Sequence, residues 1–141
     1  MEQTLLIIKP DAVAQNRIGE ILRRLETAGF AVTGLRMQTL DQETAADFYS
    51  IHQGKEFFGP LVEFMTSGPL VAVRLQGEDI RRRVREFVGV TDPAQARPGS
   101  IRADFGTSVR MNAVHASNPD EDVDRELAFF FADKTSPQEA L

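Results

Sequence analysis

Residues 4–11 read Thr-Leu-Leu-Ile-Ile-Lys-Pro-Asp, and this stretch decides how the rest of the chain is interpreted. Residues 4–8 are apolar on both alternating faces, which is typical of a strand buried in the middle of a sheet. The next three residues form a turn signal. A central strand needs a partner on each side, and the residues that follow supply candidates.

A helix is predicted directly after this turn. Apolar residues recur at helical spacing: Ile18, Ile21, Leu22 and Leu25. Asn16 is able to cap the start of the helix, and Gly29 is placed to end it. Strands are predicted at 30–39, at 70–76, where Val71, Val73 and Leu75 share one face, and at 111–116. Further helices are predicted from Asp41 to about 52, around 57–65, at 78–88 and, with an Asn118 cap and Pro119 in first position, after 118.

This order of elements predicts the α+β class. It resembles a ferredoxin-like βαββαβ antiparallel sheet with added helices and a long arginine-rich loop from Gly89 to about Arg110. The chain has 141 residues, enough for one hydrophobic core, so we expect a single domain over 1–141 with a polar tail at about 132–141.

Composition excludes several classes of function. The chain has no cysteine and only two histidines, His52 and His115, so no disulfide framework or thiolate zinc site is possible. No stretch is long and apolar enough for a membrane span, and the first residues do not resemble a signal peptide, so a cytoplasmic location is expected. A net charge of −5 argues against nucleic acid or anionic membrane as the main partner.

The distribution of charge points to a local anion site. Seven arginines and only three carboxylates lie between positions 81 and 110, in a chain that is acidic as a whole. The planar guanidinium group suits phosphate oxygens. The alternative is a solvated arginine-rich helix face, which charge alone favours.

The common phosphate-binding and hydrolase fingerprints are missing. Gly54-Lys55 lacks the flanking Gly and Ser or Thr of a P-loop, and no G-x-G-x-x-G or G-x-S-x-G occurs. Side chains must therefore hold any phosphate, and the arginine-rich segment offers them.

Six short motifs, in order, give the chain a close resemblance to the nucleoside diphosphate kinases over roughly residues 3–131. They are Leu6-Ile7-Ile8-Lys9-Pro10-Asp11, Glu56-Phe57-Phe58 with Thr66-Ser67-Gly68-Pro69, Thr91-Asp92-Pro93, Pro98-Gly99-Ser100-Ile101-Arg102-Ala103-Asp104-Phe105, Asn112-Ala113-Val114-His115 with Ser117, and Arg125-Glu126-Leu127. The resemblance implies the ferredoxin-like fold and Mg²⁺-dependent, ping-pong phosphoryl transfer from nucleoside triphosphates such as ATP and GTP to nucleoside diphosphates, with little selectivity for base or sugar. It also implies a homo-oligomer. Strand 30–39 has no obvious covering partner, which independently predicts edge pairing.

The resemblance makes His115 the catalytic nucleophile, and neutral imidazole is a good nucleophile near pH 7. Glu126 and Ser117 take supporting positions behind it. Without the surrounding motif, a packed histidine and a surface glutamate would be the ordinary interpretations of these residue types.

The same resemblance places five nucleotide-binding residues. Arg85, Thr91 and Arg102 match phosphate-binding positions, while Lys9 and Asn112 match positions that touch the sugar hydroxyl and the transferring phosphate. A spread of positive charge suits a loose transition state with charge on its equatorial oxygens. Arg81, one turn from Arg85, is as readily a solvated neighbour.

Phe57 matches the residue that stacks on the base, a contact that accepts every base. Its alternative is core packing against Leu61. Tyr49 matches a supporting position near the active lysine and equally suits a half-buried aromatic role. Mg²⁺ is expected to be held mainly by nucleotide phosphates and water, with no protein cage.

Several positions depart from the family pattern, and two of the departures flank the predicted nucleophile. Ala12 stands in place of Gly, Arg110-Met111 in place of Gly-Arg, and Ala116-Ser117-Asn118 in place of Gly-Ser-Asp.

Two rival interpretations of the function remain. A nucleotide-binding scaffold without catalysis is disfavoured by the presence of Lys9, Asn112 and His115. An RNA-binding module is disfavoured by the acidic charge of the chain and by strands without aromatic residues.

Overall fold

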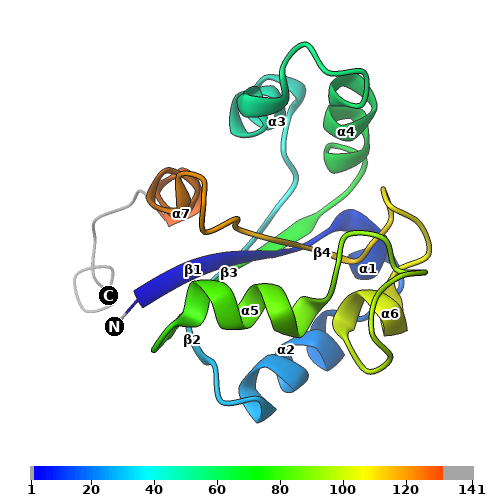
Figure 1. Ribbon diagram of the computed structural model, residues 1–141. Coiled ribbons are helices and arrows are strands. Elements are labelled where there is room, and N and C mark those ends of the chain that lie inside the picture. Colours follow the sequence, from blue (N-terminus) through cyan, green and yellow to red (C-terminus); the bar gives the residue numbers. More distant parts are fainter. Residues whose placement is uncertain (1, 132–141) are drawn as a thin grey trace.

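The computed structural model describes residues 2–131, which form a four-stranded sheet covered by helices on both faces (Figure 1). The strands are β1 (Glu2–Ile8), β2 (Ala31–Gln38), β3 (Leu70–Gly77) and β4 (Val114–Ala116). Their order in the sheet is β2-β3-β1-β4, and each neighbouring pair is antiparallel. β1 is thus a central strand, as its apolar sequence predicts.

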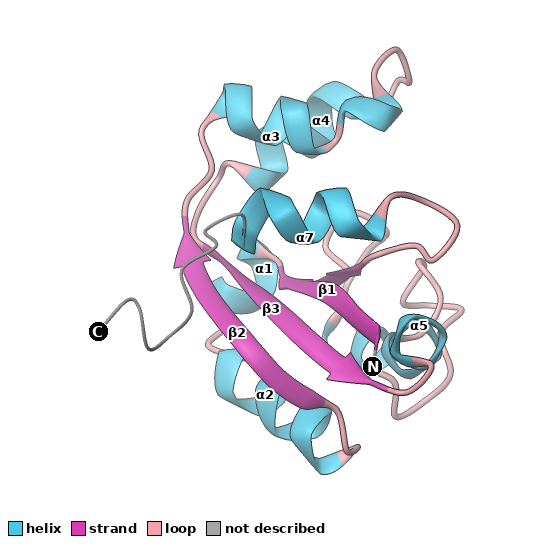
Figure 2. Cartoon of the chain, turned by 90° about the vertical axis from the view of Figure 1, so that its left-hand side faces the viewer, coloured by secondary structure: helices cyan, strands magenta, loops and turns pink. Residues whose placement is uncertain are grey.

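The βαββαβ pattern is present, and additional helices are inserted into it and appended to it. α2 (Ile18–Thr27) joins β1 to β2, and α5 (Ile80–Val88) joins β3 to β4. The short helices α1 (Pro10–Ala14) and α6 (Ile101–Phe105) lie near them. Inserted α3 (Gln42–Phe48), η1 (Ser50–His52) and α4 (Phe58–Met65), with appended α7 (Val123–Phe131), cover the opposite face (Figure 2).

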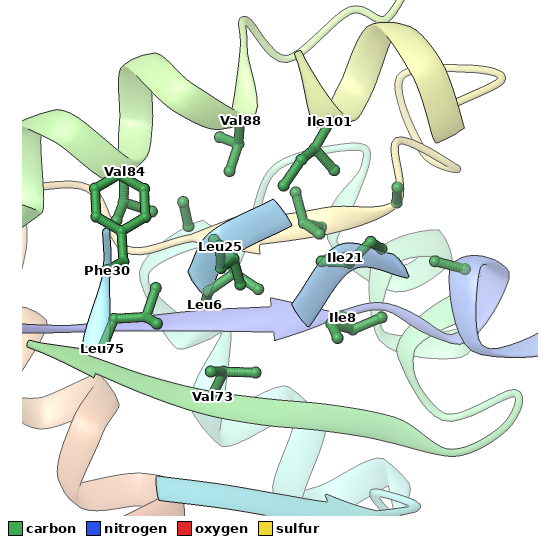
Figure 3. Close-up of a cluster of buried hydrophobic side chains, with 14 of the residues drawn as sticks. Leu6, Ile8, Ile21, Leu25, Phe30, Val73, Leu75, Val84, Val88 and Ile101 are labelled. Atoms are coloured by element: carbon green, nitrogen blue, oxygen red, sulfur yellow. The ribbon is translucent and has the colours of Figure 1, made fainter. Parts of the chain in front are cut away.

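Two apolar clusters sit on the two faces of the sheet because successive side chains of a strand point to opposite sides. Leu6 and Ile8 of β1 face the helices α2, α5 and α6, and Figure 3 shows their side chains among those of Leu25, Val84 and Ile101. Leu5 and Ile7 pack on the other face. Both clusters are closed to solvent, so β1 and most of β3 are buried on both faces of the sheet.

Most predicted elements are confirmed, and the differences lie at their ends. Gly29, with φ of 92°, follows α2 as predicted, where the Phe30 N–H donates to the Leu25 carbonyl. Asp41 caps α3 by accepting from the Thr44 N–H at 2.7 Å. The Asn16 cap is wrong, because Asn16 has φ of 60° and Arg17 is the residue before α2.

The cap predicted at the last helix is also wrong. The Asn118 side chain accepts from the Asp120 N–H and makes a local turn, and α7 begins five residues later at Val123. There the Asp122 carboxylate accepts from the Arg125 N–H. An acidic run offers several competing caps, and packing of α7 on β1 selects among them.

The predicted loop from Gly89 to about Arg110 is interrupted by α6. Arg81, Arg82, Arg83 and Arg85 precede that loop and lie on α5, which confirms the helix predicted at 78–88. The predicted strand at 111–116 shortens to three residues. The predicted polar tail at 132–141 lies outside the described residues. Within residues 2–131, no helix has the length and apolar character needed to cross a membrane.

Candidate active site

A cavity of about 590 Å³ opens where the C-terminal end of β1, the hairpin of α3 and α4, and the loops around α6 meet. Eight predicted site residues line it: Lys9, Tyr49, Phe57, Arg85, Thr91, Arg102, Asn112 and His115. The other two, Ser117 and Glu126, lie behind the histidine. Positions more than 100 residues apart in the sequence thus share one pocket.

His115 stands in the middle of β4 with about a quarter of its side chain exposed. Its Nε2 lies 3.1 Å from Oε1 of Glu126, which also accepts from the Ser117 hydroxyl at 2.6 Å. Burial opposes the ionised form of Glu126, but these hydrogen bonds outweigh it and hold the pKa of the carboxyl below its ordinary value. An ionised carboxylate only accepts, so Nε2 carries the hydrogen and Nδ1 keeps a free lone pair.

Aromatic packing fixes the plane of the imidazole. Phe48 and Tyr49 both meet the His115 ring edge-on, with centroids 5.8 and 6.0 Å away. Tyr49 is buried, and burial together with the charge of Glu126 raises its pKa, so the phenol stays neutral. Tyr49 is thus buried rather than half-buried, and the catalytic group that its ring contacts is His115.

Lys9 is a buried cation at the floor of the cavity. Its Nζ donates to the Asn112 side-chain oxygen at 2.8 Å and to the Arg110 carbonyl at 2.7 Å. Burial lowers the pKa of Lys9 to about 8, the charges of Arg102 and Arg110 act in the same direction, and Asp11 opposes them. The Asn112 amide donates to the Thr91 carbonyl, so Lys9, Asn112 and Thr91 form one chain of contacts.

Arg102 and Arg85 are held by backbone carbonyl groups. Arg102 donates to the carbonyls of Gly89 and Val114, and Arg85 donates to that of Ala116. Burial and the charge of Arg85 lower the pKa of Arg102 to about 10, which leaves it protonated at neutral pH. Its buried Nε has no hydrogen-bond partner among residues 2–131. Two positioned guanidinium groups therefore face the cavity without carboxylate partners in the described chain, as an anion site requires.

Three apolar side chains line part of the cavity. They are Phe57, 46% exposed at the start of α4, the half-buried Leu61 one turn along that helix, and the exposed Val109. The exposure excludes core packing as the main role of Phe57. The His52 ring lies 5.1 Å from that of Phe57 and extends this surface.

The hairpin that carries Phe57 is tied to α7 by Arg125. Its guanidinium donates to the carbonyls of Asp47 and Phe48 at the end of α3. Arg125 precedes Glu126, the partner of the nucleophile candidate.

Sequence reasoning missed several cavity residues. They are His52, Leu61, Val109, Arg110, Val114, Ala116, Asn118 and Glu121. The helical spacing of Leu61 from Phe57 was a usable signal, whereas Val109 and Arg110 sit in irregular backbone without one. Arg81 does not line the cavity: it pairs with Asp124 and donates to the Gln3 carbonyl, so the solvated-neighbour interpretation holds.

Comparison with known proteins bears on this arrangement. The family model described as nucleoside diphosphate kinase matches residues 2–136. A nucleoside diphosphate kinase of a Nitratiruptor species is 49% identical over 134 residues, which are 95% of this chain and 98% of that protein. One from Streptomyces avermitilis is 50% identical over 131 residues, covering 92% of this chain and 96% of its own.

Solved structures agree. The nucleoside diphosphate kinase of Aquifex aeolicus superposes with a TM-score of 0.90 at 46% identity, covering 98% of this chain and 97% of its own. A halophilic nucleoside diphosphate kinase from Halobacterium salinarum, solved in complex with CDP, gives a TM-score of 0.90 at 41% identity over 94% and 88% of the two chains.

Proposed function

The chain belongs to the nucleoside diphosphate kinase family, and we propose that it performs this family's phosphoryl transfer through a covalent intermediate on His115. One observation carries the assignment of the nucleophile. His115 lines a cavity with four cationic side chains while its Nε2 is bound to Glu126, so Nδ1 is the atom available for attack.

In the first half-reaction, the Nδ1 lone pair of His115 attacks the γ-phosphorus of the donor. The Nδ1–P bond forms as the bond from phosphorus to the bridging oxygen breaks, and the nucleoside diphosphate leaves with that electron pair. Nε2 keeps its hydrogen, and the positive charge that develops on the ring faces the Glu126 carboxylate. Arg85, Arg102 and Thr91 supply donors to the equatorial oxygens, where the charge of a loose transition state resides.

The second half-reaction is the reverse, with a different diphosphate. A terminal oxygen of the acceptor attacks the phosphorus on His115, and the Nδ1–P bond breaks. The two nucleotides never occupy the cavity together, so ping-pong kinetics are expected. Lys9 and Asn112, bound to each other beside the histidine, are suited to hold the sugar hydroxyl and the phosphate in transfer.

We propose Mg²⁺ as the cofactor, brought by the nucleotide. The donor set fits this: among the described residues that line the cavity, Lys9, Arg85, Arg102 and Arg110 are basic and Glu121 is the one carboxylate, so the protein offers ligands for phosphate and no carboxylate cage for a metal. The metal would be held by phosphate oxygens and water, where it neutralises charge on the phosphates.

A homo-oligomer is the second part of the proposal. Among the described residues β2 pairs with β3 alone, and Leu35 and Met37 on it are more than half exposed. An exposed apolar edge strand is a template for pairing with another chain. Light scattering tests this, since a single species of 15.7 kDa at micromolar concentration would contradict it.

Labelling tests the covalent intermediate. The protein is incubated with γ-labelled ATP and Mg²⁺ without acceptor, and the label should stay on the protein, be acid-labile and alkali-stable as a phosphoramidate is, and leave when ADP is added. A nucleotide-binding scaffold would bind ATP without becoming labelled. Initial-rate lines that intersect would indicate direct transfer in a ternary complex.

A further inference from the structure

A strained turn lies immediately before β4. The Val114 N–H donates to the Asn112 carbonyl at 2.9 Å, and Ala113 between them has φ of 75°. A hydrogen bond across one residue with positive φ defines the rarer and more strained form of γ-turn. A residue with a Cβ pays a steric penalty in this region, so the surrounding structure must hold it there.

The N–H and the carbonyl of Ala113 are both hydrogen-bonded to one short segment of the chain, residues 9–11. The Lys9 N–H donates to the Ala113 carbonyl at 2.9 Å, and Oδ2 of Asp11 accepts from the Ala113 N–H at 3.0 Å. Ala113 is fully buried, and Asp11 is nearly so. The segment 9–11 therefore holds the turn from both sides.

The carboxylate of Asp11 is unusual for its surroundings. Its Oδ1 is buried and has no hydrogen-bond partner among residues 2–131, although a buried charge is unfavourable unless its oxygens are satisfied. The hydrogen bond that its other oxygen, Oδ2, accepts is the one from Ala113. The contact that justifies burying this group is thus the one that holds the turn.

The turn sets two functional side chains. Asn112, on one side of it, contacts Lys9 and Thr91. On the other side, Val114 and His115 pair with Ile8 and Ile7 of β1. A relaxed turn would change the offset between Asn112 and His115, and small misplacements of reacting groups slow catalysis strongly.

We propose that Asp11 is a positioning residue for phosphoryl transfer, whose Oδ2 locks Ala113 in the strained turn and thereby fixes Asn112 and His115 relative to each other. This inference rests on the proposed role of His115. Asp11 contacts neither nucleophile nor cavity surface directly, so it acts through the backbone.

The charge of Asp11 has a separable effect. Asp11 supports the protonated form of Lys9, against burial and against the charges of Arg102 and Arg110. Replacement by asparagine keeps an acceptor oxygen for Ala113 and removes the charge. Replacement by alanine removes both.

The experiment compares Asp11→Ala, Asp11→Asn, Ala113→Gly and the double variant Asp11→Ala/Ala113→Gly. For Asp11→Ala we expect kcat to fall about 100-fold with KM changed by less than about threefold. Asp11→Asn should keep kcat within about threefold at pH 7, while the alkaline limb of its pH profile moves to lower pH. Glycine adopts positive φ without strain, so the double variant should recover about tenfold over Asp11→Ala.

Amide exchange measured by NMR gives a readout that does not depend on activity. The Ala113 and Val114 amides should exchange at least about tenfold faster in Asp11→Ala and at native rates in Asp11→Asn. Native kcat and exchange in Asp11→Ala, or no recovery in the double variant, would overturn the proposal. If Asp11→Ala does not fold, the double variant decides: recovery of folding by Ala113→Gly supports the proposed role of Asp11, and failure to fold overturns it. A native protein that is never labelled by ATP would refute the role of His115. Amide exchange would still test whether Asp11 holds the turn at Ala113.

Discussion

The apolar face of the sheet under α2 and α5 and the cavity at the end of β1 differ in the polarity of their side chains. The first is a cluster of apolar residues from Leu6 to Ala116 that are closed to solvent (Figure 3). The second is lined by the buried polar side chains of Lys9, Arg102 and Asn112, and the buried carboxylate of Glu126 lies behind His115. Apolar burial stabilises the fold, whereas buried polar groups with unfilled hydrogen-bonding capacity are prepared for a ligand. Mutations in the two regions should therefore have separable effects.

The largest effect should follow removal of the nucleophile. His115→Ala should lose labelling by ATP and reduce exchange at least about 10⁴-fold, because no other group takes the phosphoryl. His52→Ala, which removes the other histidine from the same cavity, should keep both activities. Stopped-flow exchange with radiolabelled nucleotide measures both. Exchange that survives in His115→Ala would refute the mechanism.

The next largest effect should be a loss of stability caused by a substitution in the apolar cluster. Leu6→Ala should lower the free energy of unfolding by about 3 kcal/mol, because it leaves a cavity in a fully buried cluster. Chemical denaturation measures this. Turnover per folded molecule at low temperature should stay near the native value, and a loss as large as that of a site variant would show that the regions are not separable.

Arginine substitutions test whether the cavity uses specific contacts or diffuse charge. Arg102→Ala and Arg85→Ala should each weaken nucleotide binding and slow transfer by about 2 kcal/mol, the loss of one charge-assisted contact. Arg83→Ala is the matched control, because Arg83 lies on α5 against the Phe30 ring and outside the cavity. Thermal melting checks the fold of Arg102→Ala. Equal effects from all three variants would favour diffuse charge.

The pH dependence follows from Lys9. Its charged form is lost as pH rises through about 8, so transfer should decline between pH 7 and 9. The unfolded chain keeps this proton up to about pH 10.5, so the cost of burying a charged Lys9 is relieved, and the fold gains stability from this group, as pH rises from about 8 to about 10.5. Activity and this contribution to stability should therefore move in opposite directions. Lys9→Arg, which keeps its charge, should show no such decline, and a flat native profile would contradict the assignment.

The smallest effect should be the choice of base. Phe57, Leu61 and Val109 offer apolar area, and stacking accepts purines and pyrimidines alike. Values of kcat/KM for ADP, GDP, CDP and UDP should differ by less than about a hundredfold, roughly 3 kcal/mol. A larger preference would require a polar contact to one base.

The sequence predicts the layered part of the molecule better than the cavity. β1 and α2 carry strong apolar patterns, and both form where expected. α1 and α6 have five residues each, too few for a helical period to be visible, so the first was predicted as a turn and the second as part of a loop. The choices made at Asn16 and Asn118 depend on packing, which local preference does not contain.

In the cavity, too, the sequence predicts which residues take part but not how they are arranged. The motifs identify residues that one pocket brings together, but motif spacing does not show that Nε2 of His115 faces Glu126 or that Ala113 adopts positive φ. Those facts arise from tertiary contacts, between Asp11 and Ala113 and between His115 and Glu126, which local sequence preference does not contain.

Arg125 has a consequence for how this chain can vary. It holds the end of α3, which leads into the hairpin carrying Phe57, and the next residue holds His115. One turn of α7 therefore contacts both the α3–α4 hairpin that carries Phe57 and the imidazole of His115. A substitution that repacked this turn would disturb both contacts at once. Substitutions at Arg125 and Glu126 should therefore be tolerated less often than substitutions on the solvent-facing side of α7.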